Sequence, residues 1–450
     1  MARQSDRLRR RAPRVTHTCA IKEDAMTIAR LTRRHFLKTS AAGVLTAAGA
    51  APALAQGTRL HFLQWSHFIP AADQVFEEQA KEFGKQAGVE IAIERINQND
   101  IQARLTAAIQ SGSGADIVIV ANNHALLYEN SLVDVTDVAE EIGRKQGGWH
   151  DYAKANGVTS GGRWVAVPQF IISWAVTYRE DWFKEAGFEY PKTWDDFRKV
   201  GRAMKAKGKP FGQAFGHSIN DPNNWCYPLV WMWGGMEVQK DGKTVALESK
   251  NTVEAVKFNN VLWKDVFDEG GLAWDDSTNN RAFLSSEISL TGNAPSIYVA
   301  ARQKFPDVYK GTNHGHFPPG PAGRFYWLPA WNSVVMKYSK NQKVAKDFIR
   351  FYMDRARFDR YFETMDTFGI PGTKAYSDHP LWRKDPKTAV FPETLPNARQ
   401  VGYAGPAGRK ATEALSKYVI VDMFAKAIQG MSPEDAVKWA AGELKKIYAA

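Results

Sequence analysis

Tryptophan and asparagine side chains that follow short apolar runs are the residues of this sequence best suited to chemistry, and that chemistry is binding. All 15 Trp lie beyond residue 56. Aromatic faces stack on the apolar faces of sugar rings, while neighbouring amides and carboxylates bond the hydroxyl groups. Trp65-Ser66-His67 and Asn122-Asn123-His124 each come directly after an apolar run. This pattern favours a cleft that holds a carbohydrate-like molecule.

The sequence lacks the motifs that are typical of catalysis. It contains no Gly-rich phosphate loop ending in Lys-Ser/Thr, no Gly-x-Ser-x-Gly turn and no His-Glu-x-x-His helix. His314-Gly315-His316 has the spacing of a metal pair on a strand, but no third ligand stands near it, so we expect a structural role. Cys226, the only cysteine after residue 56, is expected to be buried and inert. The sequence therefore predicts no cofactor and no metal.

The segments that must position these side chains alternate between strand and helix patterns. Residues 60–65, 89–93 and 116–120 read as strands, and residues 71–85 and 101–110 show helical spacing of apolar residues between them. Strand-helix-strand-helix-strand is the pattern of a doubly wound α/β sheet with a parallel core. Ligands of such sheets meet the loops beyond the carboxyl ends of the strands, which places the two loops above at one edge.

Further elements are expected along the rest of the chain. Residues 161–168 predict a hairpin strand, and the run from Phe170 to Tyr178 a second one. Thr193 is expected to cap the helix that starts at Trp194. Other helices are predicted over residues 179–186, 251–269, 342–364 and 432–448.

Residues 1–56 contain an export signal and are not expected to form a binding surface. Arg33 and Arg34, followed by Phe36-Leu37-Lys38, an Ala-rich stretch and Ala53-Leu54-Ala55, match a bacterial twin-arginine export signal that is cleaved near Ala55. The signal predicts a soluble periplasmic protein that the twin-arginine translocase exports in folded form. The start codon is Met1 or Met26, a choice that the sequence leaves open.

The net charge of +11 does not indicate a nucleic-acid partner. Residues 1–56 hold eleven Lys and Arg against three Asp and Glu, so the remaining chain has 48 basic and 45 acidic side chains. A chain of this length exceeds what one core usually organises, so two lobes are expected.

Several motifs occur in an order that resembles the extracellular solute-binding proteins of ABC importers, the group that includes maltodextrin-binding and glycerol-phosphate-binding proteins. The matching stretches are residues 111–118, 167–168, 178–183, 191–197, 316–321, 345–351 and 428–436. The chain departs from the family pattern at residues 285–290 and at Ser296, where a sugar-stacking Trp often stands. These departures concern the identity of the ligand and not the fold.

The resemblance implies a type II periplasmic binding protein with two α/β lobes, each a doubly wound, mostly parallel sheet flanked by helices, and a ligand cleft between the lobes. By analogy, residues 57–168 and 330–371 form one lobe and residues 169–329 and 372–450 the other. Chain crossings near Pro168, Pro329 and Pro371 are expected to form the hinge. The implied function is a monomeric receptor that captures a small solute and delivers it to an ABC permease in the inner membrane.

The expected solute-binding residues come from the family positions and from the residue types. They are Trp65, Asn122, Asn123, His124, Trp174, Asn224, Trp225, Trp231, Trp233, Asn293, Trp331 and Asn332. Trp231 and Trp233 share a face only if they lie on a strand, and one of the two is expected to reach the ligand.

Other functions remain open at this stage. An exported enzyme is the alternative, because twin-arginine export often carries folded cofactor proteins. Within the binding class, a polyol, a glycosylated phosphate or an amine competes with a sugar. The Trp- and Asn-rich set of residues favours a neutral ligand, since an amine requires carboxylates and a phosphate requires Arg or Lys.

Overall fold

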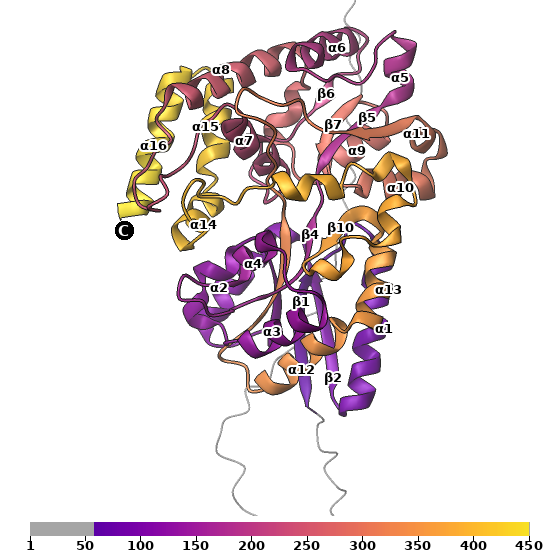
Figure 1. Cartoon of the computed structure of the whole chain (residues 1–450), viewed down its shortest axis with the longest axis vertical. Coiled ribbons are helices and arrows are strands. Elements are labelled where there is room, and N and C mark those ends of the chain that lie inside the picture. The colour runs from indigo at the N-terminus through magenta and orange to yellow at the C-terminus, as the bar shows by residue number, and fades with distance from the viewer. Residues whose placement is uncertain (1–57, 450) are drawn as a thin grey trace, which may run out of the picture. The chain divides into compact units, whose positions relative to one another are not determined.

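The computed structural model describes residues 58–449, which form two β-sheets covered by helices (Figure 1). The export signal with Arg33 and Arg34 lies outside the described residues. The first sheet has the strand order β10-β4-β9-β3-β1-β2 and the second β6-β7-β5-β8. We call the six-stranded sheet and its helices the first lobe, and the four-stranded sheet and its helices the second lobe. The α/β class with two sheets is confirmed.

Three parallel strands begin the first lobe as the sequence predicts. β1 (Arg59–Trp65) pairs in parallel with β2 (Glu90–Ile96) and with β3 (Ile117–Ala121). α1 (Pro70–Ala87) connects the first two strands, and α2 (Ile101–Ser111) leads to the third. Both helices end at a glycine in the left-handed conformation, Gly88 and Gly112, which a residue without a Cβ adopts at little cost.

The other three strands of the first sheet lie where the chain passes between the lobes. β9 (Ala330–Val335) pairs antiparallel with β3 and with β4 (Val167–Ile172), and β10 (Gly369–Pro371) pairs antiparallel with β4. A strand that leaves a lobe and one that enters it run in opposite directions. For this reason the sheet is less parallel than expected.

The helices of the first lobe cover both faces of its sheet. In Figure 1, α2 and the helices α3 (Thr136–Lys145) and α4 (Asp151–Gly157) lie on one side, and α1 lies on the other with α13 (Arg355–Met365). α12 (Gln342–Tyr352) packs on α3 and β9. The single helix predicted over residues 342–364 is therefore two helices, because Asp354 has an extended backbone, with φ −58° and ψ 138°.

The second lobe has a smaller sheet of mostly antiparallel pairs. β5 (Ala175–Arg179) pairs antiparallel with β7 (Leu290–Asn293) and with β8 (Thr312–Gly315), and only β6 (Phe211–Gly212) runs parallel to β7. The strand predicted from Phe170 to Tyr178 is split between β4 and β5, since the chain changes sheets at Ser173 and Trp174.

Ten α-helices of the described chain pack on the second sheet or on one another beside it. They are α5 (Glu180–Glu185), α6 (Trp194–Ala206), α7 (Asp221–Met232), α8 (Lys250–Asp265), α9 (Thr278–Leu284), α10 (Ser296–Lys304), α11 (Pro306–Gly311), α14 (Arg409–Ser416), α15 (Val419–Ile428) and α16 (Pro433–Ala449). The Thr193 side chain accepts a hydrogen bond from Asp196 N, which confirms the predicted cap of α6. No helix of the described residues is long and apolar enough to cross a membrane.

Candidate functional site

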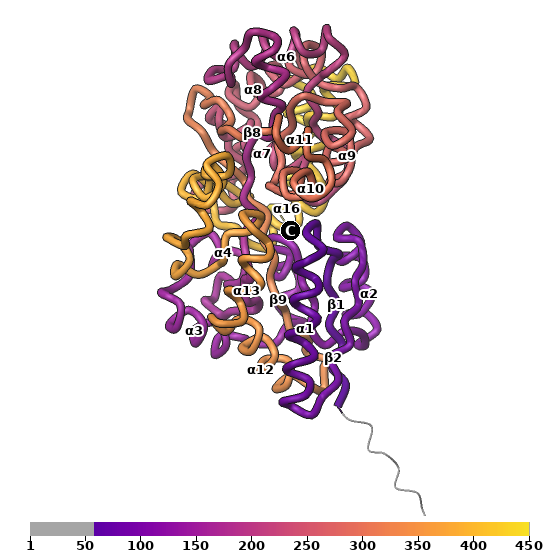
Figure 2. Tube along the Cα trace, turned by 90° about the vertical axis from the view of Figure 1, so that its right-hand side faces the viewer, coloured from indigo at the N-terminus to yellow at the C-terminus, as the bar shows by residue number. Residues whose placement is uncertain are grey.

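The polar loops after β1, β2 and β3 share one edge of the first sheet. Ser66 and His67 follow β1, residues 97–99 follow β2, and residues 122–124 follow β3. Because β1 is parallel to both of its neighbours, the carboxyl ends of the three strands lie together. Figure 2 shows that this edge of the first lobe, near β1 and α2, faces the region of α9 and α10 in the second lobe.

Two stacked tryptophans stand at this edge. The rings of Trp65, at the end of β1, and Trp331, on β9, are parallel within 5° with centroids 4.4 Å apart. Both are buried, and the Trp331 indole nitrogen has no hydrogen-bond partner. A tryptophan N–H normally finds a partner when it is buried. The Trp331 N–H is therefore a donor without an acceptor inside the protein.

Asn122 and Asn332 leave one donor and one acceptor unused. Asn122 has a left-handed backbone with φ 51°, its Oδ1 accepts a hydrogen bond from Ala330 N at 3.0 Å, and Asn332 Nδ2 donates to Asn122 O at 2.6 Å. These bonds fix the orientation of both amides, because a carbonyl oxygen accepts only and an N–H only donates. Asn122 Nδ2 and Asn332 Oδ1 then have no partner.

Asn123 and His124 are buried against the second lobe. The side-chain atoms Oδ1 and Nδ2 of Asn123 lack partners. Its main-chain carbonyl accepts a hydrogen bond from the Thr412 hydroxyl of α14 at 3.4 Å. Burial lowers the pKa of His124 to about 4. The imidazole is therefore neutral at physiological pH and offers one donor and one acceptor.

The start of α7 forms the facing wall in the second lobe. Asp276 caps this helix, because its carboxylate accepts hydrogen bonds from Asp221 N at 2.8 Å and from the Ser218 hydroxyl at 2.5 Å. Burial raises the pKa of Asp276 to about 6. Burial, and next the carboxyl group of Asp276, raise the pKa of Asp221 well above its ordinary value.

Direct hydrogen bonds join the two walls. Gln98 Nε2 of the first lobe donates to Asp276 Oδ2 at 2.6 Å, and Asn220 Nδ2 of the second lobe donates to Gln98 Oε1 at 3.3 Å. Ile219 N also donates to Asn99 Oδ1 at 3.2 Å. A cavity of about 280 Å³ lies beside these contacts, lined by Ser66, Phe68 and residues 97–99 of the first lobe and residues 275–277 of the second.

Buried polar atoms without partners concentrate in this region. Nine of the 19 such side-chain atoms among the described residues belong to the loop after β3, to β9 and to the start of α7. They are Asn122 Nδ2, Asn123 Nδ2 and Oδ1, Asn220 Oδ1, Asp221 Oδ2, Asn223 Oδ1, Asn224 Oδ1, Trp331 Nε1 and Asn332 Oδ1. Buried polar groups are normally hydrogen-bonded, so the cluster points to a polar molecule that supplies the missing partners.

The family model of bacterial extracellular solute-binding proteins matches residues 78–390. The chain belongs to this family. A probable ABC transporter-binding protein of Deinococcus radiodurans is 23% identical over 304 residues, which cover 64% of this chain and 70% of the relative.

Solved structures share the fold of this solute-binding protein. The maltose-bound MalE3 of T. maritima has a TM-score of 0.75 at 21% identity, and 86% of this chain covers 99% of it. An Arthrobacter chlorophenolicus A6 sugar transporter protein with bound laminaribiose has a TM-score of 0.76 at 18% identity, over 86% of this chain and 99% of the other. An ABC transporter solute-binding protein of Agrobacterium radiobacter K84 in complex with ribitol has a TM-score of 0.73 at 19% identity, over 87% and 99%.

Two other predicted residues of the solute-binding protein lie where the chain enters the second sheet. Trp174 links β4 to β5 and is buried, and its indole nitrogen comes within 3.4 Å of the position that a Cβ on Gly292 would occupy. Asn293 ends β7, and its Nδ2 donates to Asn280 Oδ1 at 2.7 Å. Their contact with a solute stays a prediction.

The predicted residues on α7 and after it pack within the second lobe, and their contact with a solute stays a prediction. The Trp225 indole nitrogen donates to Asn259 Oδ1 at 2.8 Å and the Trp231 indole nitrogen to Glu237 at 2.9 Å, so both donors are already used inside the second lobe. Trp233 stacks on Phe258 at 4.5 Å. Asn224 borders a small void with Trp194 and Trp225. Because α7 is a helix and not a strand, Trp231 and Trp233 point apart.

Sequence reasoning missed three residues that the structure brings to the site. Gln98 and Asp276 join the lobes, and Tyr418 stacks on His217 with ring centroids 4.4 Å apart. Tyr418 has φ 54°, a strained conformation for a large residue, and the charge of Asp276 acts on its hydroxyl. Gln98 follows β2, so the rule that identified the loops after β1 and β3 also applies to it.

The remaining candidates are structural. The two histidine rings bond within the fold, His314 Nδ1 to Lys387 O at 2.8 Å and His316 Nδ1 to the Tyr326 hydroxyl at 2.7 Å. Cys226 is buried in α7, and burial raises its pKa. No group of three side chains that could hold a metal ion occurs in the described residues.

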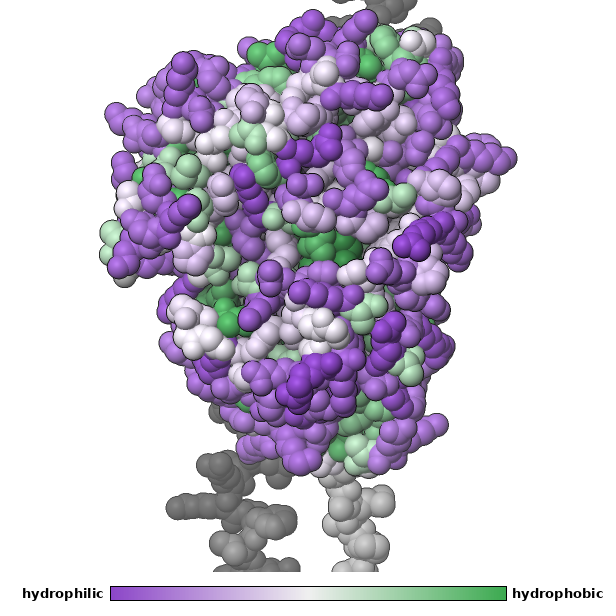
Figure 3. All heavy atoms as spheres, in the orientation of Figure 1, coloured by the Kyte–Doolittle hydropathy of each residue, from purple (hydrophilic) through white to green (hydrophobic). Residues whose placement is uncertain are grey.

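A second cavity of about 640 Å³ lies on another face. Tyr152 of α4, Ile370 of β10, Trp382 and Leu395 are among its lining residues. Figure 3 shows an apolar hollow in the middle of this face, over the place where Figure 1 labels β4 and β10. The polar side chains that lack partners in the loop after β3 and in α7 do not line this cavity.

Proposed function

We propose that this protein is the substrate-binding component of an ABC importer and captures a carbohydrate-like solute, such as a sugar, an oligosaccharide or a polyol, between its two lobes. The proposal depends above all on the nine buried polar atoms without partners in the loop after β3, β9 and the start of α7, near the stacked pair Trp65 and Trp331. A molecule with an apolar ring face and several hydroxyl groups complements such a wall. Membership in the solute-binding family supports the transport role, and several structural neighbours hold sugars or a polyol.

The solute acts as a bridge between the lobes in this proposal. Trp331, Asn122 and Asn332 contact it from the first lobe, and Asn220, Asp221 and Asn223 from the second. A ligand that binds both walls has a higher affinity for the closed state, so it shifts the population towards closure around the hinge strands β4, β9 and β10. The permease in the inner membrane then recognises the closed receptor.

The sequence and the family both support the location that we propose. The proposed site of action is the periplasm, reached through the twin-arginine translocase that reads Arg33 and Arg34, with cleavage near Ala55. The receptor works as a monomer in this account.

A thermal-shift screen tests the proposed function. Purified protein is heated with mono- and oligosaccharides, polyols, phosphates and amines, each at several concentrations. Because a ligand that binds only the native state raises the melting temperature by mass action, we expect a concentration-dependent rise with at least one sugar or polyol. A rise with inorganic or organic phosphates alone, and with no sugar or polyol, would refute the proposal.

A further inference from the structure

One ion pair joins the two lobes directly. Arg302 Nη2, in the last turn of α10 in the second lobe, lies 2.5 Å from Asp366 Oδ2, which directly follows α13 of the first lobe. Figure 2 shows α10 on the side of the second lobe that is turned towards the first. Every other ion pair of residues 58–449 lies within one lobe or involves residues 372–408. Separation of the lobes therefore requires the pair to break.

Asp366 makes this contact from a strained turn. Its backbone has φ 58° and ψ −140°, a conformation that glycine adopts readily and other residues rarely adopt. The turn is held in place, because the Ser173 hydroxyl donates a hydrogen bond to Thr367 O at 2.9 Å. Ser173 itself lies where the chain passes from the first sheet to the second. An aspartate at a position that suits glycine points to a role for its carboxylate.

The pair is isolated from other polar partners and is partly exposed. Among the described residues, neither side chain has another hydrogen bond or ion pair. Burial acts to lower the pKa of Arg302, but the hydrogen bond to Asp366 outweighs it, so the pKa is raised. The side chains of Arg302 and Asp366 are 40% and 18% exposed, so salt screens their attraction. The contact between the lobes should therefore weaken as the ionic strength rises.

The turn that carries Asp366 also packs against the proposed solute site. The ring of Phe368, two residues further on, has its centroid 6.4 Å from that of Trp65 and 5.1 Å from that of His67. β10, one of the strands at the crossing between the lobes, begins at the next residue, Gly369. A short stretch of chain thus connects the interlobe ion pair to the stacked tryptophans and to the hinge.

We propose that Arg302 and Asp366 form a latch that favours the closed arrangement of the lobes and thereby raises the affinity for the solute. The inference rests on the proposed function, because it assigns two residues that control closure around the solute. A ligand that bridges both lobes binds the closed population, so its apparent affinity rises with the fraction of closed molecules. Arg302 and Asp366 are positioning residues in this account, since they act through the lobes and not through contact with the solute.

Small-angle X-ray scattering of the unliganded protein tests the latch without any solute. Native protein is compared with Arg302→Gln and Asp366→Asn at about 20 mM and about 500 mM NaCl. We expect a larger radius of gyration in both variants at low salt, and a native value that approaches theirs at high salt. Asp366→Gly, which suits the left-handed backbone, serves as a second variant at this position. Equal radii for native protein and all three variants at low salt would overturn the latch.

A matched control removes an ion pair that does not cross between the lobes. Asp359 pairs with Arg355 at 2.9 Å within α13, so Asp359→Asn alters the same helix and leaves the interlobe contact intact. Its radius of gyration should equal that of the native protein at both salt concentrations. An expansion in Asp359→Asn as large as that in Asp366→Asn would mean that a general loss of charge, and not the latch, opens the protein.

Calorimetric titration with glucose, maltose and sorbitol measures the effect on binding. For any of the three that binds, Arg302→Gln and Asp366→Asn should each lower the affinity about threefold or more. The double variant should bind as tightly as either single variant, because one substitution already breaks the pair. Fully additive losses would show that the two residues act separately and would contradict the latch.

The two measurements separate the latch from the proposed function. If affinity falls in the variants but the scattering does not change, the latch is overturned and the proposed function stands. If no sugar or polyol binds the native protein, the proposed function fails, and the scattering of the unliganded variants still decides whether Arg302 and Asp366 hold the lobes together.

Discussion

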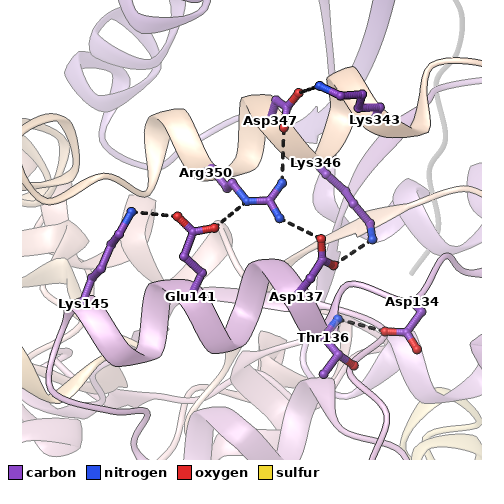
Figure 4. Close-up of polar contacts among 9 residues, drawn as sticks. All are labelled: Asp134, Thr136, Asp137, Glu141, Lys145, Lys343, Lys346, Asp347 and Arg350. Carbon is purple, nitrogen blue, oxygen red and sulfur yellow. Dashed lines mark hydrogen bonds and ion pairs between the residues drawn. The ribbon is translucent and has the colours of Figure 1, made fainter.

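Two clusters of polar side chains in this protein differ in whether their members satisfy one another. Figure 4 shows the first cluster, on the surface of the first lobe, where Arg350 of α12 bonds Glu141 at 2.8 Å and Asp137 at 2.7 Å on α3. Lys346 also bonds Asp137, and Lys145 bonds Glu141. Burial acts to raise the pKa of Asp137, but hydrogen bonds from Lys346 and Arg350 outweigh it, so its pKa is lowered.

The second cluster, formed by the loop after β3, β9 and the start of α7, is buried more deeply and satisfied less well. Asn123, Asn223 and Trp331 are each no more than 1% exposed, yet each has a polar atom without a partner. An unsatisfied buried group costs about 1–3 kcal/mol, so nine of them are a substantial cost to the protein unless another molecule supplies the missing partners. The contrast shows that the members of the α3–α12 cluster satisfy one another, whereas those of the second cluster do not; under the proposed function a solute supplies the missing partners.

Removing the aromatic platform should produce the largest effect. We expect Trp65→Ala to weaken solute binding by about a hundredfold or more, because the ring supplies stacking area that no neighbour replaces. Calorimetric titration measures the change. The matched control is Trp149→Ala, a buried ring in the same lobe that packs on Trp164 and whose N–H already bonds Ala139 O. Unchanged solute affinity in Trp65→Ala would contradict the site.

The buried carboxyl group of Asp276 should make stability depend on pH. Its pKa is raised from 3.8 to about 6, so its folded form binds a proton more tightly than its unfolded form. The resulting stabilisation is present below about pH 4 and is lost as the pH rises through about 6, by ~3 kcal/mol at most. Urea unfolding between pH 4 and pH 7 should show native protein losing stability relative to Asp276→Asn. If the native protein instead gains stability relative to Asp276→Asn as the pH rises, Asp276 is not buried as described.

A pair of Trp→Phe variants isolates the value of a missing partner. Both Trp331→Phe and Trp225→Phe remove the same atoms, but only Trp225 has a partner inside the protein, at Asn259. We expect Trp331→Phe to weaken solute binding about tenfold, and Trp225→Phe to lose about 1–2 kcal/mol more of unfolding free energy than Trp331→Phe while binding normally. If Trp225→Phe weakened binding and Trp331→Phe lost more unfolding free energy, the distinction between satisfied and unsatisfied groups would be wrong.

The smallest effect is expected in the satisfied cluster. Arg350→Met should lower the unfolding free energy by about 1 kcal/mol, because its ion pairs are partly exposed and screened by water. Solute affinity should remain within about twofold of the native value. A larger change in affinity would mean that the α3–α12 surface also takes part in binding.

Local patterns predicted most of the fold. The structure confirms three such patterns, each of which depends only on residues close by in the sequence. They are the apolar alternation at Leu60–Trp65, the helical spacing over residues 71–85 and the cap at Thr193. The directions of β9 and β10 could not be derived in this way. They depend on where the chain crosses between lobes, which a local pattern does not encode.

The candidate site was less predictable than the fold. Trp65, Trp331 and Asn122 follow from their position after a strand or at a crossing, and the structure brings them together. Trp225 and Trp231 are also tryptophans, but they belong to the core of the second lobe. Their N–H groups bond Asn259 and Glu237, and no motif in the sequence marks these two residues as partners. Asp276 lies 178 residues from Gln98 along the chain, so only the tertiary structure shows that they meet.

A crystal structure of the protein with the solute that raises its melting temperature tests the central claim most directly. The account predicts that the solute lies between the lobes, with its polar atoms within about 3.2 Å of Trp331 Nε1, Asn122 Nδ2 and Asn223 Oδ1. A solute bound instead in the cavity beside Tyr152 and Trp382, with those three atoms still unpartnered, would contradict it.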